Sequence, residues 1–279
     1  MLKYPRLTER QASINNQQTR RGRLYAQVVA GSKGRTVTKS STLPAKKSER
    51  EPKRDSVTAA FLRLRDLIVE GQIAPGSWVV EAELAERLKL SRTPIRGALQ
   101  LLQREGFITE RRGGKKSRLH ISALTKEDAH ELYMIVGMIE GLAGTLAASL
   151  DLAGRENLCG TLKKFNERLG AIATSKKVEL RLVFELDTRF HHEIVSAGAG
   201  PRLQVLHQVM KPQIERYWRL YAHTIIQDLH HSVAEHEEII AAIAAGNVKG
   251  AERSLSTNWR NGAERIKRVI DLFGERGSW

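Results

Sequence analysis

Apolar residues at helical spacing predict a short helix between residues 91 and 106. Ser91 is a favourable N-cap, Pro94 lies in the first turn where a missing N–H costs nothing, and Gly106 ends the helix. The buried stripe consists of Ile95, Ala98, Leu99 and Leu102. The other face carries side chains that can reach phosphates and base edges, namely Arg92, Thr93, Arg96, Gln100 and Gln103. A solvated surface helix is the alternative interpretation.

The flanking segments favour a DNA-binding helix. An amphipathic helix is expected over 81–88, and only a short turn separates it from residue 91, which is the pattern of a helix-turn-helix. Two strands are expected over 107–111 and 117–121, around a basic hairpin tip formed by Arg112, Gly113, Gly114, Lys115 and Lys116. Such a tip beside the helix predicts a wing. Upstream, Val57 to Glu70 reads as a further amphipathic helix.

From residue 126 to the end the pattern is helical. Thr125 is an N-cap with an acidic residue three positions later. Helices are expected near 126–150, 154–174, 178–197, 201–223, 229–245 and 248–273, and Pro212 should kink or split the fourth. The predicted fold class is mainly α, with an N-terminal winged helix-turn-helix and a C-terminal all-α bundle of six or seven helices.

Length and charge divide the chain further. With 279 residues, 41% of them hydrophobic, it can form two domains with cores and a tail. Residues 1–54 carry 14 Lys and Arg against 3 Asp and Glu, whereas residues 122–279 carry 20 of each. We expect a disordered basic tail over 1–54, a DNA-binding domain over 55–121, a linker over 122–125, and an effector-binding and dimerisation domain over 126–275. The tail could equally be a DNA-grasping arm or the product of a misassigned start.

The composition limits the chemistry. Cys159 is the only cysteine, which excludes an internal disulfide and a zinc site built from cysteines. The longest apolar stretch, 132–150, contains Glu140 and is expected to be a buried bundle helix rather than a membrane span. No Walker loop, nucleophile elbow or zinc-protease motif occurs, so we expect no enzymatic activity.

One group of residues in the expected bundle could bind a metal. Asp187 and His191 are four residues apart on one helix face, and His236 lies on a later helix. Three such ligands would leave open coordination positions for water or for a carboxylate of an effector. A buried or surface hydrogen-bonded pair is the alternative.

The stretch from Pro75 to Gly114, with its run LSRTPIR, resembles the GntR family of bacterial winged-helix regulators. The resemblance implies that Arg92, Thr93 and Arg96 contact operator DNA and that Gly113 and Gly114 lie at the wing tip. Ala82 stands where relatives often have a DNA-contacting arginine. Gly97, which replaces a common glutamate, is a poor helix former inside the recognition helix.

The segments DTRFHHEIVSAGAGPRL and SVAEHEEIIAAIAAGN resemble the FCD effector domain of the FadR-like GntR branch. Many members bind a divalent metal through one Asp and three His, and the metal helps to hold a small carboxylate. Asp187, His191 and His236 match three positions, but Asn258 stands at the fourth, where an amide is a weaker ligand for a zinc-like ion. Val136 replaces an arginine that would clamp a carboxylate, so other cations such as Arg216 become candidates.

These observations predict a cytoplasmic, nucleoid-associated homodimer that binds a palindromic DNA operator and responds to a small-molecule effector, with no membrane partner. Repression is the tendency of the family. The alternative is a non-specific architectural DNA-binding protein, which would use the basic tail for DNA and the bundle only for dimerisation.

Overall fold

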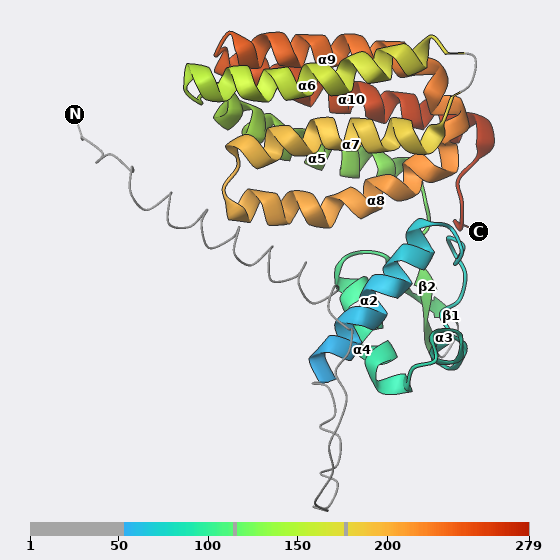
Figure 1. Cartoon of the computed structure of the whole chain (residues 1–279). Helices are drawn as coiled ribbons and strands as arrows, with labels where there is room; N and C mark the ends of the chain where they lie inside the picture. The colour runs from blue at the N-terminus through green and yellow to red at the C-terminus, as the bar shows by residue number, and fades with distance from the viewer. Residues whose placement is uncertain (1–52, 114–115, 176–177, 279) are drawn as a thin grey trace, which may run out of the picture. The chain divides into compact units, whose positions relative to one another are not determined.

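A computed structural model describes residues 53–113, 116–175 and 178–278 (Figure 1). Nearly all of the expected basic tail, residues 1–54, therefore lies outside the described residues. The first described helix is α2 (Lys53–Val69), which begins earlier than the expected start at Val57.

The predicted helix-turn-helix is present as α3 (Glu81–Leu88) and α4 (Arg92–Arg104). Lys89 makes the turn between them in a left-handed conformation, with φ 54°. Ser91 is the N-cap residue of α4, although its side chain makes no capping hydrogen bond. These two helices, α2 and the wing enclose one apolar core, which includes Leu64, Ile95, Leu99, Leu102, Phe107 and Ile121.

The structure gives Gly97 a packing role that the sequence pattern did not suggest. A Cβ at this position of α4 would lie 2.9 Å from Cγ1 of Val57 on α2, so the glycine lets the two helices approach closely. The loss of helix propensity, about 1 kcal/mol relative to alanine, is offset by this close packing.

The wing is a two-stranded antiparallel sheet of β1 (Ile108–Gly113) and β2 (Lys116–Ile121). Ile108 pairs with Ile121 at its base and Gly113 with Lys116 next to its tip. The strands extend further towards the tip than the sequence pattern predicted.

Six long helices and one short 3₁₀ turn follow, which confirms the predicted helical bundle. They are α5 (Lys126–Ala148), α6 (Leu152–Ala173), α7 (Leu180–Gly198), α8 (Pro201–Ile225), η1 (Ile226–Asp228), α9 (Leu229–Ala244) and α10 (Val248–Phe273). The expected N-cap Thr125 accepts a hydrogen bond from the N–H of Asp128. Pro212 lies inside a continuous α8, so the expected splitting of this helix is wrong. A proline removes only one helical hydrogen bond, and Met210 and Ile214 on either side of Pro212 pack in the same apolar cluster.

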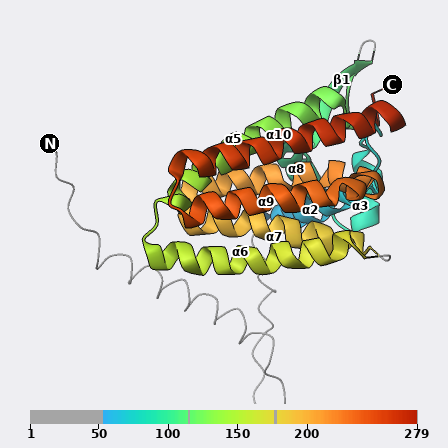
Figure 2. The ribbon, with the colours of Figure 1, turned by 90° about the horizontal axis from the view of Figure 1, so that it is seen from above.

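Helices α5 and α10 lie side by side along the bundle (Figure 2). Three glycines of α5 form the seam: Cβ atoms at Gly137, Gly141 and Gly144 would come within 3.0, 2.7 and 2.4 Å of side chains on α10. The seam therefore lets the two backbones approach and places Glu140 against α10. Among the described helices, α5 is long and apolar enough to cross a membrane by length and composition, and half of its most apolar stretch is buried in the bundle.

Candidate functional site

The expected DNA-reading side chains lie together on one exposed face of α4. Arg92, Thr93, Arg96 and Gln100 are all exposed, while the apolar stripe on the opposite face is buried. The guanidinium Nε of Arg96 donates to Oε2 of Glu81 on α3 at 2.6 Å, and the Arg96 side chain remains 65% exposed. The ion pair orients Arg96 without burying it. A guanidinium held in this way still presents donors to DNA.

The wing tip is described only in part. Gly113 closes β1 opposite Lys116, whereas Gly114 and Lys115 lie outside the described residues. The two wing strands also bring Arg111 and Arg118 opposite each other, both exposed. A basic pair on this hairpin suits contact with the phosphate backbone.

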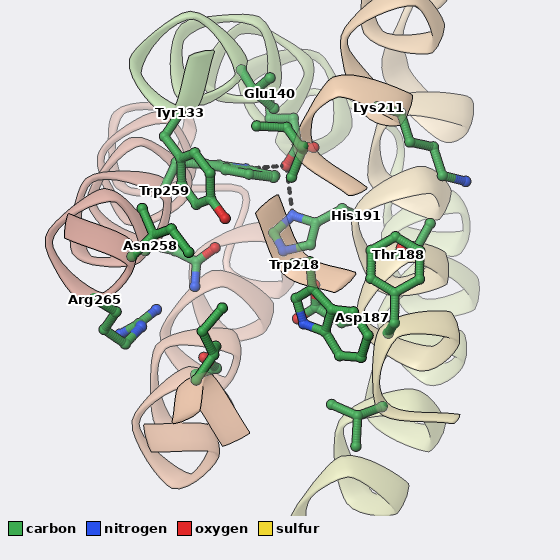
Figure 3. A pocket seen from close by; sticks show the side chains of 18 of the residues that line it. Tyr133, Glu140, Asp187, Thr188, His191, Lys211, Trp218, Asn258, Trp259 and Arg265 are labelled. Atoms are coloured by element: carbon green, nitrogen blue, oxygen red, sulfur yellow. Dashed lines mark hydrogen bonds and ion pairs between the residues drawn. The ribbon is translucent and has the colours of Figure 1, made fainter. Parts of the chain in front are cut away.

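Asp187, His191 and His236, which the sequence pattern predicts as metal ligands, come together in the bundle. Asp187 and His191 project from α7 and His236 from α9, and one ligand atom of each lies within 4.8 Å of the others. Nε2 of His236 is 3.7 Å from Oδ1 of Asp187. Figure 3 shows Asp187 and His191 on the wall of a pocket.

The tautomer of His236 follows from its neighbour Asn166 on α6, which is fully buried. The amide nitrogen of Asn166 donates to the carbonyl of Val233 and to Glu237 Oε1, so its oxygen faces His236. Nδ1 of His236 therefore donates to Asn166 Oδ1 at 3.1 Å. The buried Nε2 then carries a lone pair with no hydrogen-bond partner. The Phe190 ring stacks on His236 at 3.8 Å between centroids and holds its orientation.

Glu140 of α5 orients the other imidazole. This fully buried carboxylate accepts from His191 Nδ1 at 2.5 Å, from Trp259 Nε1 at 2.7 Å, and from His207 Nε2 at 2.8 Å. With Nδ1 engaged, Nε2 of His191 is the nitrogen left for a ligand. Carboxylates and amides that hold the outer nitrogen of a histidine are typical of metal sites.

The electrostatics of the site follow from burial and from the Glu140 charge. Burial by itself would raise the pKa of Glu140, but the interactions with His191 and His207 prevail and lower it to about 2. Burial would lower the pKa of His191, but Glu140 raises it to about 9. The pKa of Asp187 is raised by burial, whereas burial lowers the pKa of His236 well below its ordinary value. His236 is therefore neutral at pH 7, as a metal ligand must be.

Asn258, at the expected fourth position, lines the same pocket from α10. Its amide nitrogen donates to Glu235 Oε2 at 2.7 Å. Arg265 also binds Glu235, with both guanidinium ends at 2.8 and 3.0 Å. Because its nitrogen is engaged, the oxygen of Asn258 is the atom available to a metal or an effector. The two imidazoles of His191 and His236 and the carboxylate of Asp187 are a donor set that fits a zinc-like ion.

The pocket lined by Asp187, His191 and Asn258 has a volume of about 1030 Å³, part of which is open solvent. Much of its wall is apolar or aromatic, with Val136, Val183, Phe184, Ile214, Trp218 and Ile266 among the residues. Within the described residues, the Tyr133 hydroxyl and the half-buried Lys211 ammonium have no hydrogen-bond partner. The pocket thus offers free donors within an apolar enclosure.

Arg216, suggested by the sequence as an effector-binding cation, does not line the pocket. It is buried beside the winged helix, where Nη2 donates to the carbonyl of Ser122 at 2.6 Å and Nη1 donates to Gln213. The residue lies on the other face of α8 from pocket-lining Ile214 and Trp218. Helical periodicity cannot show which face of a helix meets the pocket when both faces are buried.

Sequence reasoning missed Asn166, His207 and the role of Glu140. An acidic residue at the centre of the apolar stretch 132–150 was a usable signal, because a buried carboxylate needs partners. Asn166 and His207 carry no such local signal, and only the packing of α6 and α8 against the site reveals them.

Comparison with known proteins agrees with this arrangement. Residues 57–115 match the gntR family of bacterial regulatory proteins, and residues 131–261 match the FCD domain. The chain is a GntR family transcription regulator with a C-terminal FCD domain. Proteins of this family are transcription regulators rather than enzymes.

Relatives of this GntR regulator span most of its length. The Gluconate operon transcriptional repressor of Bacillus subtilis is 26% identical and aligns over 73% of this chain and 82% of its own. The Bacillus subtilis regulator YdhC is 26% identical over 76% of this chain and 91% of its own. Among solved structures, Escherichia coli McbR/YncC has a TM-score of 0.56 at 17% identity and covers 78% of this chain and 99% of its own, which supports the fold.

Proposed function

We propose that this regulator is an operon repressor whose DNA binding is controlled by a small carboxylate in the FCD pocket. One observation carries the proposal: the imidazoles of His191 and His236, each with Nδ1 engaged in a hydrogen bond, converge on Asp187, and Asp187 and His191 line a pocket beside them. Repression rather than activation is supported by relatives that are named as operon repressors. We propose the domain division stated above, with DNA binding over 55–121 and effector binding over 126–275.

Asp187, His191 and His236 would hold a divalent, zinc-like metal, with Asn258 as a weak fourth ligand. When bound, such an ion attracts an oxygen ligand of the effector. Glu140 and Asn166 keep the imidazoles in the tautomers that the ion requires. Asn258 makes metal affinity lower than that of a site with three histidines.

The charges on the pocket wall support one class of effector. Of the lysine and arginine side chains that line it, Arg265 is neutralised by Glu235, whereas the half-buried Lys211 feels the charge of Glu215 but makes no hydrogen bond or ion pair within the described residues. Val136 contributes no charge. We therefore assign the site to a monocarboxylate with a sizeable apolar body: its carboxylate faces the histidines and the Tyr133 hydroxyl, and its body contacts the aliphatic and aromatic wall.

The DNA partner would be a palindromic operator read by a homodimer. Arg92, Thr93, Arg96 and Gln100 on α4 would enter the major groove, and the wing with Gly113, Gly114 and Lys115 would contact the backbone or the minor groove. The homodimer is supported by family membership and by an exposed apolar face on α5. Met138, Leu142 and Leu146 project from this helix with 64, 52 and 40% exposure.

A second copy of the chain would cover this face, and Leu142→Asp should convert a dimer to a monomer in analytical ultracentrifugation. The repressor would act in the cytoplasm, associated with the nucleoid.

The test uses the purified full-length protein. Metal content and melting temperature are measured before and after chelation, with Asn258→His as an internal comparison. Genomic DNA selection then identifies the bound sequences, and carboxylates with apolar bodies are screened for release of that DNA. Stoichiometric metal and one enriched sequence family released by a monocarboxylate are expected. Equal binding to all fragments would support an architectural protein and refute the proposal.

A further inference from the structure

The residues after α10 do not leave the fold but turn back along the segment that joins the winged helix to the bundle. Leu124 and Arg276 form a short antiparallel bridge, in which the Leu124 N–H donates to Arg276 at 2.8 Å and the Arg276 N–H donates back at 3.1 Å. Glu275 accepts from the N–H of Lys126, and the Tyr221 hydroxyl donates to the carbonyl of Gly274. Residues 274–278, here called the strap, are therefore held by backbone and side-chain hydrogen bonds.

The strap also contacts the winged helix. Gly277 and Gly76 lie back to back, both with φ +78°. A Cβ on Gly277 would come 2.4 Å from the Gly76 nitrogen, and a Cβ on Gly76 would come 2.5 Å from the Gly277 Cα. Arg111 of β1 donates to the carbonyl of Gly277 at 3.2 Å. The Gly76 N–H donates to the carbonyl of Ile121 in β2, so the strap contacts β1 through Arg111 and is linked to β2 through Gly76.

The other end of the strap continues from the pocket. Helix α10 supplies Asn258, Arg265 and Ile266 to the pocket wall and ends at Phe273, immediately before the strap. The contacts at Gly76 leave no free space, so a shift of the end of α10 cannot be absorbed between the two glycines. It must move the turn at Gly76, the Arg111 side chain, or both.

A second pocket helix holds the winged helix at another point. On α8, Gln213 donates to the carbonyl of Glu105, which caps the recognition helix, at 2.6 Å. Arg216 on the same helix donates to Ser122, just after β2. These contacts supply a fixed support for the recognition helix, against which a movement of the strap would tilt the wing.

We propose that the strap transmits the state of the FCD pocket to the wing. This regulatory role rests on the proposed function, because it requires a pocket occupant that shifts α10. One part of this role requires no ligand, because the strap also positions the wing in the free protein. An occupant acts by changing the relative stability of two positions of the wing.

The test is a matched pair of glycine substitutions in the full-length protein. Gly277→Ala introduces a Cβ at φ +78° against Gly76, whereas Gly274→Ala introduces one at φ +78° with nothing within 4 Å. Both alanines are placed at the same positive φ, and only the first breaks the contact. Gly76→Ala, with Gly71→Ala as its own control at φ +71°, repeats the comparison from the winged helix side.

Hydrogen exchange measured without and with ZnCl₂ supplies the readout. In Gly277→Ala the Leu124 amide should exchange about tenfold faster than in the wild type or in Gly274→Ala, because its acceptor on Arg276 is displaced. Zinc should protect α7 and α9 in every variant, and it should alter exchange in β1 only where the strap is intact. A β1 response that persists in Gly277→Ala would overturn the proposal, as would an unchanged Leu124 amide.

Failure of the metal site is distinguishable from failure of the strap. If zinc leaves α7 and α9 unaltered in the wild type, the metal part of the proposed function is wrong. The strap is then decided by the Leu124 amide and by affinity for a DNA fragment selected with the wild type, which should fall at least fivefold in Gly277→Ala relative to Gly274→Ala. Equal affinities would refute the role of the strap.

Discussion

Replacing Glu140 with glutamine removes the buried charge that holds His191, and the effect on metal binding can be calculated. Glu140 raises the pKa of His191 to about 9, so His191 is protonated at pH 7 in the metal-free protein. A metal requires the Nε2 lone pair, and removing that proton at pH 7 costs roughly 3 kcal/mol. The zinc association constant of the wild type should therefore rise about tenfold per pH unit from pH 7 to about 9.

In Glu140→Gln the pKa of His191 should fall steeply, because burial lowers it and only the smaller effects of Asp187 and Glu235 still raise it. The proton cost at pH 7 disappears, and the affinity should be nearly constant between pH 7 and 9. Loss of the supporting carboxylate weakens the metal site by roughly 10- to 100-fold, a deficit that should be seen in full at pH 9. At pH 7 the two affinities should approach each other.

Zinc affinity is measured by competition with a chromophoric chelator from pH 6.5 to 9, with circular dichroism to confirm folding. The exposed Glu238 on α9 provides a matched control, since Glu238→Gln removes the same charge near His236 without contacting His191. It should reproduce the wild-type slope. Parallel pH profiles for wild type and Glu140→Gln would refute the reasoning. The free energy of unfolding of the metal-free protein should change with pH in the opposite direction to the zinc affinity. The raised pKa of His191 adds stability that is fully present below pH 6.5 and is lost as the pH rises through about 9.

Three further predictions concern the fourth ligand, the recognition helix and the tail. Asn258→His should raise zinc affinity at least tenfold, measured by the same competition, because imidazole replaces a neutral amide oxygen; unchanged affinity would place residue 258 outside the coordination sphere. Arg96→Ala should weaken binding to a selected operator by about 1–3 kcal/mol in an anisotropy titration, and an equal loss on random DNA would reduce Arg96 to a phosphate contact. Deletion of residues 1–52 should lower the dependence of DNA affinity on salt concentration, and an unchanged slope would exclude a DNA-grasping arm.

The sequence by itself was sufficient for the winged helix-turn-helix. Its elements are short and local: an apolar stripe at helical spacing, a cap at Ser91, a stop at Gly106 and a glycine-containing hairpin tip all act within a few residues. The six helices of the bundle also followed from Gly and Pro punctuation. Pro212 does not split α8 as one of the two expected outcomes had it, because a single lost hydrogen bond does not end a helix of 25 residues.

The sequence also identified Asp187, His191 and His236 as a group, since spacing on one helix and a family resemblance both point to them. It could not determine their chemical state. The tautomers depend on Asn166 and Glu140, which come from two other helices, and the pKa of His191 depends on a carboxylate 51 residues away. The sequence also could not decide where the Arg216 side chain lies. Its position on α8 is compatible with the pocket or with the winged helix, and only the packing of the helices places it against Ser122.

The local patterns of this chain thus determine which segments are helices and strands, and which face of α4 is free to read DNA. Only the tertiary structure decides which buried polar groups meet. The partners of Glu140 lie on three separate helices, and the strap reaches Leu124 and Gly76 from the far end of the chain. The physical reason is that hydrogen bonding and desolvation depend on distances between elements, which no periodicity within a single element encodes.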